Sequence, residues 1–148
     1  MTVASITSVN VKKAVPFFGV TNMAASLRFY VDGLGFKMQH RWIPNREEHN
    51  LDGKIRWCRL ELGDAAIMLQ EFLPERQPQE TLGTGVNVSF QCEDALALYR
   101  EFKSSGIQTR QRPFVGNRLW VVPLTDPDGY RIEFASPTDA PEESELEE

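Results

Sequence analysis

The chain has 148 residues, of which 41% are hydrophobic and 25% are charged. These values are typical of one globular domain, or of two small repeats that share a core, and they exclude a collagen, a coiled coil and a wholly disordered chain. No apolar run approaches the roughly 20 residues that a membrane-spanning helix needs. The formal net charge is −5, but residues 139–148 hold six acidic and no basic side chains. The remaining chain is nearly neutral, which argues against a nucleic-acid-binding protein.

The two ends of the chain are expected to lie outside the folded domain. Residues 1–13 are predicted to form an N-terminal arm, and they lack the basic and long apolar parts of a signal peptide. Residues 137–148 are predicted to be a solvated, disordered acidic tail, with a partner site as the alternative. Cys58 and Cys92 form no CxxC motif, so they indicate structural thiols and a cytoplasmic location.

Residues 14–72 combine four strand patterns with one helical pattern. Asn22 is a typical helix N-cap, apolar residues follow at helical spacing, and Gly33 and Gly35 end the helix. A polar loop is expected over 44–53, and Gly63 and Asp64 predict a tight turn. The strands are predicted over 14–20, 36–42, 55–62 and 65–72.

The same order of elements returns after a proline- and glycine-containing linker over 73–85. Within residues 86–136, Asp94 is expected to begin a helix that Gly106 ends. The sequence Asp-Pro-Asp-Gly at 126–129 is typical of a β-turn, and residues 113–117 are expected to form a loop. The strands are predicted over 86–91, 107–112, 119–125 and 130–135.

This internal duplication predicts an α+β fold. Each half is a βαβββ repeat that supplies a four-stranded sheet and one helix. Neither repeat can bury both faces of its sheet by itself. We therefore expect a single domain over 14–136, in which the two repeats form a curved mixed sheet around a concave cleft, with the helices on the outer face.

Three segments of the chain resemble the vicinal oxygen chelate superfamily, which includes glyoxalase I, extradiol dioxygenases and bleomycin-resistance proteins. They are the helix signature within 20–36, the second helix start within 93–106, and the last hairpin, Asp-Pro-Asp-Gly-Tyr-Arg-Ile-Glu-Phe, at 126–134. The resemblance covers about 14–136 and implies the glyoxalase/bleomycin resistance fold, with a homodimer as the family habit. The fold alone does not fix the function, because it hosts lyases, oxygenases, transferases and binding proteins.

The resemblance also implies where a metal would bind, at four positions that metal-dependent members fill with His, Gln or Glu. Counting along this chain places those positions at Val15, Gln70, Asn87 and Glu133. Valine has no donor atom and the two amides are weak donors, which leaves one strong ligand for a transition metal. We therefore expect no metal and no other cofactor. The alternative is a divalent transition metal on Glu133 and Gln70.

The remaining candidate ligands are expected to lie elsewhere. His40 and His49 fall outside the implied positions and are interpreted as surface histidines. Strand alternation turns Glu71 to the face opposite Gln70. A shift of one residue would exchange these two and would give a Glu71/Glu133 pair, so a metal site stays open as an alternative.

Without a metal, the cleft is a binding cavity whose lining follows from strand parity and from aromatic residues suited to a planar ligand. The predicted ligand-binding residues are Trp57, Arg59, Met68, Gln70, Asn87, Trp120, Arg131 and Glu133. The leading hypothesis is a metal-free small-molecule-binding protein of the glyoxalase/bleomycin-resistance type, of the kind that gives antibiotic resistance. The alternative is a metal-dependent lyase, isomerase or dioxygenase that acts on a vicinal-oxygen substrate. The expected partners are a small molecule and a second copy of the chain, with no nucleic acid and no membrane.

Overall fold

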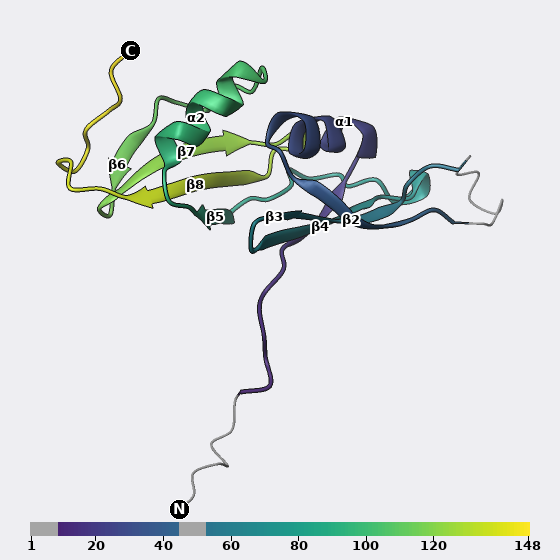
Figure 1. Cartoon of the computed structure of the whole chain (residues 1–148). Helices are drawn as coiled ribbons and strands as arrows, with labels where there is room; N and C mark the ends of the chain where they lie inside the picture. The colour runs from purple at the N-terminus through teal and green to yellow at the C-terminus, as the bar shows by residue number, and fades with distance from the viewer. Residues whose placement is uncertain (1–8, 45–52) are drawn as a thin grey trace, which may run out of the picture.

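The computed structural model describes residues 9–44 and 53–148 and contains the two expected βαβββ repeats (Figure 1). The first repeat runs through β1 (Phe17–Val20), α1 (Met23–Leu27), η2 (Arg28–Gly33), β2 (Lys37–Trp42), β3 (Trp57–Leu62) and β4 (Ala65–Glu71). A short helical turn, η4 (Pro74–Arg76), lies between the repeats. The second repeat runs through β5 (Asn87–Gln91), α2 (Ala95–Ser104), β6 (Phe114–Gly116), β7 (Leu119–Thr125) and β8 (Arg131–Pro137).

Each repeat forms its own four-stranded sheet, and the two sheets have equivalent strand orders, β1-β4-β3-β2 and β5-β8-β7-β6. In both sheets the first strand pairs in parallel with the last, and the other neighbours are antiparallel. This arrangement confirms the predicted α+β class. In the part of the chain that the structure describes, the sheets are not joined by a ladder, so β1 and β5 remain edge strands. The helices α1 and α2 lie on the same side of the two sheets (Figure 1).

Both helices begin where the sequence predicted. The side-chain oxygen of Asn22 accepts a hydrogen bond from the amide of Ala25 at 3.0 Å, and Asp94 accepts one from Ala97 at 3.0 Å. Each contact satisfies an amide that has no partner within its helix. The first helix differs from the prediction in its second half, where α1 continues as the π-helical turn η2. There the amide of Leu34 bonds to the carbonyl of Phe29 at 3.0 Å.

The strand predicted over 107–112 is wrong, and the loop predicted over 113–117 contains β6 instead. Arg110 donates one backbone hydrogen bond to Pro123, but regular pairing with β7 begins only at Phe114. Pro113 has no amide hydrogen to donate to a ladder, which separates the two parts of this segment. Ile107 does not face a strand partner. Its side chain lies against the backbone of Gly33, where an added Cβ would stand 2.4 Å from Ile107 Cδ1.

One apolar core fills the space between the helices and both sheets. It joins the repeats through an aromatic chain in which Phe36 packs edge-on against Phe90, with ring centroids 5.8 Å apart, and Phe90 stacks on Phe134 at 5.1 Å. Aromatic contacts of this kind add stability beyond the area that they bury. The two repeats therefore form a single folded unit within one chain.

Polar contacts also join the repeats where the Asp-Pro-Asp-Gly turn meets η2 and β1. The hydroxyl of Tyr30 donates to Asp126 Oδ2 at 2.8 Å, and both side chains are buried. The hydroxyl of Tyr130 donates to the carbonyl of Gly19 at 2.8 Å, and its ring stacks on Phe18 with centroids 4.3 Å apart. The turn that the sequence predicted is thus the place where the second repeat is fastened to the first.

The end of the chain is not the disordered tail that the sequence predicted. Residues 141–148, which we call the C-terminal strap, lie beside the outer edge of β6 and form a bridge between Phe114 and Glu145. The amide of Val115 donates to the carbonyl of Ser144 at 2.8 Å. Leu146 packs against the apolar core, which explains why this acidic segment is held on the sheet. Composition predicted the charge of the segment but could not show the unpaired strand edge that receives it.

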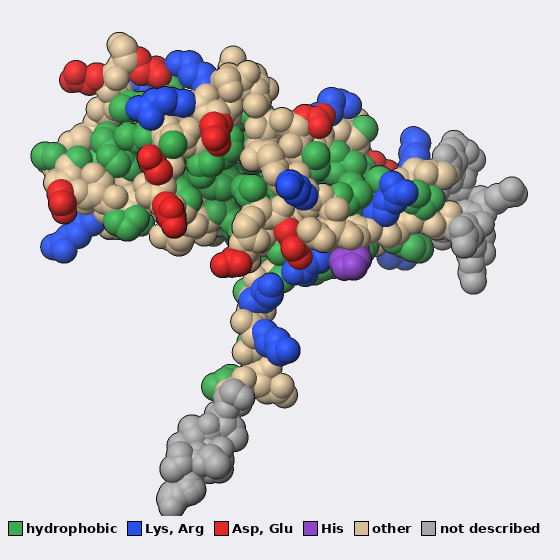
Figure 2. Space-filling view, viewed as in Figure 1, with side chains coloured by type: hydrophobic (Ala, Val, Ile, Leu, Met, Phe, Trp, Pro, Cys, Tyr) green, Lys and Arg blue, Asp and Glu red, His purple; other side chains and the backbone are tan. Residues whose placement is uncertain are grey.

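Charged side chains of both signs are scattered over the face of the molecule shown in Figure 2, without a large patch of one sign. None of the helices in the described ranges is long and apolar enough to cross a membrane. The described part of the N-terminal arm leaves β1 on the side opposite the helices and runs away from the body (Figure 1). Val9 and Val11 in this arm are 79% and 78% exposed, so its apolar side chains lack contacts within the chain.

Candidate functional site

Each sheet has one face under its helix and one open face turned away from the helices. On the open face of the second sheet, the carboxylate of Glu133 lies between two neutral donors from β5. Asn87 Nδ2 donates to Oε1 at 2.7 Å, and Ser89 Oγ donates to Oε2 at 2.8 Å. Gln91 Nε2 donates to the same serine oxygen at 2.8 Å. The structure therefore brings the predicted residues Asn87 and Glu133 together and adds two polar neighbours.

Two arginines stand on the same open face. Arg131 precedes Glu133 by two residues on β8, so the two side chains share a face, and Arg131 is exposed. Arg110 donates its backbone amide to Pro123 at 2.9 Å and its Nη1 to the carbonyl of Leu124 at 2.6 Å. Partial burial, followed by the charge of Arg131, lowers the pKa of Arg110. Sequence analysis missed Arg110, because this irregular segment is placed beside β7 only by its hydrogen bonds to Pro123 and Leu124.

On the open face of the first sheet, the predicted residues Trp57, Arg59, Met68 and Gln70 share one side. Gln70 pairs with Trp57 across β3 and with Gly19 across β1, while Met68 pairs with Arg59 and Phe17. Arg59 Nε forms an ion pair with Glu61 Oε2 at 2.9 Å on this face. Trp57 is half-buried, which leaves part of its ring accessible to a ligand.

Trp120 does not belong with the other predicted residues. Pro123 is paired with Glu133 across β7 and β8 and so lies on the open face. Trp120 is an odd number of residues away, which turns it to the helix side, where it packs against the core. Its ladder partner Ser136 accepts a hydrogen bond from the amide of Ala95, at the start of α2, at 2.8 Å. Trp120 thus fills core space beside α2.

Glu71 lies on the helix side of β4, as strand alternation predicted. Its Oε2 accepts a hydrogen bond from the amide of Met23 at 2.7 Å, and its Oε1 pairs with Arg56 Nη1 at 3.3 Å. Arg56 is buried and also donates to the carbonyl of Phe72. The carboxylate is thus committed to the first turn of α1, and the shift that would pair Glu71 with Glu133 does not occur.

The strand register corrects one position in the predicted metal set. Ser89 stands five residues before the cap Asp94 and pairs with Glu133. Phe17 stands five residues before the cap Asn22 and pairs with Met68. Met68, and not Gln70, is therefore the repeat counterpart of Glu133. A count along the sequence missed this because the two repeats close with hairpins of different lengths.

The corrected donor set does not fit a transition metal. It consists of one carboxylate, one amide, one thioether and a valine, whereas such ions favour imidazole, thiolate or several carboxylates. Both oxygens of Glu133 already accept hydrogen bonds from neutral side chains. In the described ranges, no group of three or more His, Cys, Asp or Glu residues is placed to hold a metal. His40 is exposed on β2, as predicted, and His49 lies outside the described residues.

A hollow of about 320 Å³ lies at the end of β1 and β4, beside Gln70. The ring of Phe72 forms one wall, and it crosses β1 directly above Gly19, where an added Cβ would stand 2.4 Å from Phe72 Cζ. Only glycine leaves room for that ring. The hollow is lined by Phe17, Gly19, Arg56, Gln70, Glu71, Phe72, Leu73 and Arg76. It is small for a drug-sized ligand, so the open face needs further walls to enclose one.

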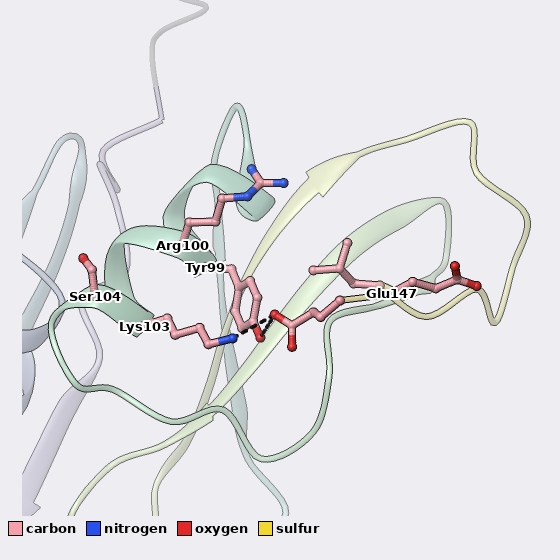
Figure 3. Close-up of a pocket in the computed structure, with 7 residues that line it drawn as sticks. Tyr99, Arg100, Lys103, Ser104 and Glu147 are labelled. Atoms are coloured by element: carbon pink, nitrogen blue, oxygen red, sulfur yellow. Dashed lines mark hydrogen bonds and ion pairs between the residues drawn. The ribbon is translucent and has the colours of Figure 1, made fainter.

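A second hollow, of about 490 Å³, lies between α2 and the C-terminal strap (Figure 3). Its floor is occupied by the strap itself, because Glu148 Oε1 accepts hydrogen bonds from the Tyr99 hydroxyl at 2.8 Å and from Lys103 Nζ at 3.0 Å. These contacts raise the pKa of Tyr99 and lower the pKa of Glu148. This hollow is separate from the open faces and serves the attachment of the strap.

The two cysteines are both free thiols, as the sequence indicated. Cys58 is buried under the helices, and burial raises the pKa of its thiol to about 11. Cys92 is half-buried and lies where its Sγ contacts the carbonyl of Ala135. Neither thiol stands on an open face, so neither is a candidate nucleophile for chemistry there.

Paired βαβββ repeats, each with a four-stranded sheet and one open face, define a recognisable class of α+β protein. A family model described as Glyoxalase/Bleomycin resistance protein/Dioxygenase superfamily matches residues 13–134. The chain therefore belongs to this superfamily, as its motifs predicted. A comparison with curated proteins found no match.

Solved structures with this fold include two that are described as binding antibiotics. TnmS3, an antibiotic-binding protein from Streptomyces sp. CB03234, is 19% identical, with a TM-score of 0.62 over 88% of this chain and 100% of that one. A bleomycin-binding protein complexed with bleomycin is 20% identical, with a TM-score of 0.60 over 85% and 98%. A glyoxalase/bleomycin resistance protein/dioxygenase from Nocardioides is 15% identical, with a TM-score of 0.59 over 97% and 95%. At these identities the neighbours show that the fold is shared.

Proposed function

We propose that this protein binds a small organic molecule on the open faces of its sheets, without a metal, and sequesters it. The observation that carries the proposal is the hydrogen bonding of the Glu133 carboxylate. Its two oxygens accept from Asn87 and Ser89, and its repeat counterpart is a methionine. Such a carboxylate is prepared to orient a ligand through hydrogen bonds, whereas its neutral neighbours offer a transition metal no second strong ligand.

A second copy of the chain is proposed to complete the cleft. In the described residues the outer edges of β1 and β5 have no strand partner. Large apolar side chains are exposed near those edges, with Phe17 at 52% and Val86 at 55%. An unpaired edge flanked by exposed apolar side chains favours association with another sheet. A homodimer that joins these edges would bring the open face of one repeat opposite the other and supply the missing walls. The two free thiols support a cytoplasmic location.

Replacing Glu133 with Gln tests the role of this side chain. We expect binding to weaken about tenfold, because a ligand group that donates to this carboxylate loses its charged acceptor, and such a hydrogen bond is worth about 1.5 kcal/mol. Bleomycin and other antibiotics are titrated while the intrinsic tryptophan fluorescence, to which Trp57 contributes, is followed. Glu101→Gln on α2 is the matched control, because that side chain lies away from both open faces, and it should bind like the wild type.

Metal content separates this proposal from its alternative, a metal-dependent lyase, isomerase or dioxygenase. Protein purified without chelator is measured by elemental mass spectrometry, before and after incubation with Mn²⁺, Ni²⁺, Fe²⁺ or Zn²⁺. We expect no stoichiometric metal, and ligand titrations that are the same with and without chelator. One equivalent of metal that is lost in Glu133→Gln would overturn the proposal and favour the enzyme.

A further inference from the structure

The two arginines of the open face of the second sheet form no ion pair among the described residues, whereas two arginines of the first repeat each pair with a glutamate. Arg56 pairs with Glu71 at 3.3 Å and Arg59 pairs with Glu61 at 2.9 Å. Arg110 and Arg131 have no carboxylate within ion-pair distance among the described residues. Glu133 lies on their face, but its oxygens accept hydrogen bonds from the neutral donors of β5. The two guanidinium groups thus keep their donors available.

The backbone holds Arg110 in place for this role. Its Nη1 bonds to the carbonyl of Leu124 at 2.6 Å, so the side chain crosses the edge of β7 beside Pro123. Pro123 pairs with Glu133, and Thr125 pairs with Arg131. The side chain of Arg110 is therefore fixed next to the positions that carry Glu133 and Arg131. A group held before a ligand arrives loses less conformational freedom on binding.

Two like charges in one place oppose each other. Arg131 is the second cause, after burial, of the lowered pKa of Arg110, and the opposing attraction of Glu133 ranks third. An anion bound between the guanidinium groups would offset this repulsion. Arginine suits the task because its planar fork of donors matches the oxygens of carboxylate, sulfonate and phosphate groups.

We propose that Arg110 and Arg131 form an anion subsite on the open face, so that the ligand carries an oxyanion group. This inference rests on the proposed function and names the chemistry of the ligand. Val121 and Ala135, which pair with each other on this face, are 6% and 0% exposed and so offer no surface to a ligand. The ligand that fits therefore carries a carboxylate, sulfonate or phosphate group at the two arginines.

Two fluorescent probes of similar size test the subsite in the full-length protein. One is anionic, 8-anilinonaphthalene-1-sulfonate, and the other is its neutral relative, N-phenyl-1-naphthylamine. We expect Arg110→Met and Arg131→Met each to raise the Kd of the anionic probe about tenfold, as loss of one hydrogen bond to a charged group predicts. The Kd of the neutral probe should change less than about twofold, since an apolar body makes no charge-assisted contact.

Arg100→Met on α2 is the control, because it removes an arginine that lies beside the strap and away from the open face. Arg131 is exposed and makes no hydrogen bond among the described residues, so Arg131→Met keeps the test decisive if Arg110→Met fails to fold. Unchanged affinity for the anionic probe in both variants would overturn the subsite and leave the proposed function standing. Failure of both probes to bind the wild type would count against the proposed function itself and against the subsite with it.

Discussion

Replacement of Tyr30 with Phe is expected to lower the free energy of unfolding by about 2–3 kcal/mol. The hydroxyl of Tyr30 is the hydrogen-bond donor to Oδ2 of Asp126, and both residues are buried. A hydrogen bond to a charged group contributes about 1.5–3 kcal/mol, and a buried acceptor left without a donor adds its desolvation cost. Urea denaturation followed by circular dichroism measures the difference at pH 7.

The pH dependence identifies Asp126 as the cause. Burial raises the pKa of Asp126, and the Tyr30 hydrogen bond lowers it. When the pKa is higher in the folded protein than in the unfolded chain, the folded protein binds more protons between the two values, so stability falls as pH rises through that interval. Loss of Tyr30 raises the folded pKa further. The cost of Tyr30→Phe should therefore be smaller at pH 4 than at pH 7, and Asp126→Asn should remove most of this dependence.

Tyr130→Phe is the matched control, since its hydroxyl donates to the neutral carbonyl of Gly19. Its removal should cost about 1 kcal/mol, the usual value for a neutral hydrogen bond, without a pH dependence of this origin. If Tyr30→Phe and Tyr130→Phe were equally mild at pH 7, the buried carboxylate would not need its donor. The fastening of the repeats would then depend on the apolar core alone.

The sequence predicted the elements that depend on local chemistry. Asn22 and Asp94 were identified as helix caps because amide and carboxylate side chains satisfy free amides of the first turn, and both make that contact. The Asp-Pro-Asp-Gly turn was recognised from the conformations of Pro127 and Gly129. Periodicity and the repeated order of elements were then sufficient for the α+β class and for the βαβββ repeats.

Features that depend on pairing between distant residues could not be predicted from the sequence. Trp120 was predicted to bind a ligand because its aromatic ring suits a planar molecule, but the β7–β8 register turns it to the helix side. Met68 replaced Gln70 as the counterpart of Glu133 for the same reason, because register is set across the sheet and not along the chain. Arg110 was missed because only its hydrogen bonds to Pro123 and Leu124 determine its place.

Because the two sheets are separate, the predicted ligand-binding residues do not form one continuous site within the chain. The predicted residues fall into two groups, one around Gln70 and one around Glu133, each on the open face of its own repeat. The edge strands β1 and β5 have no partner in the described part of the chain, which leaves each group open on one side. A ligand that contacts both groups therefore requires the second copy proposed above. Ligand affinity should then decrease when the protein concentration falls below the dissociation constant of the dimer.

Deletion of residues 139–148 is expected to open the edge of β6 while the fold persists. The strap covers that edge through backbone hydrogen bonds, and Leu146 packs on the core. Each hydrogen bond adds only about 0.5–1.5 kcal/mol, and ordering the strap opposes it, so we expect global stability to fall by only about 1–3 kcal/mol. Local protection should change far more. Hydrogen exchange at the amide of Val115, which donates to Ser144, should accelerate at least about 100-fold.

The amide of Val122 provides the internal control, because this residue lies in the centre of the sheet, paired with Phe134, and its protection should follow global stability alone. Leu146→Ala separates the apolar contact from the backbone contacts. It should loosen the strap and speed exchange at Val115, while Glu147→Ala, on an exposed neighbour, should leave exchange unchanged. Exchange at Val115 that stays slow after deletion would mean that β6 is protected without the strap. An exposed strand edge would then need another cover, such as the second copy of the chain.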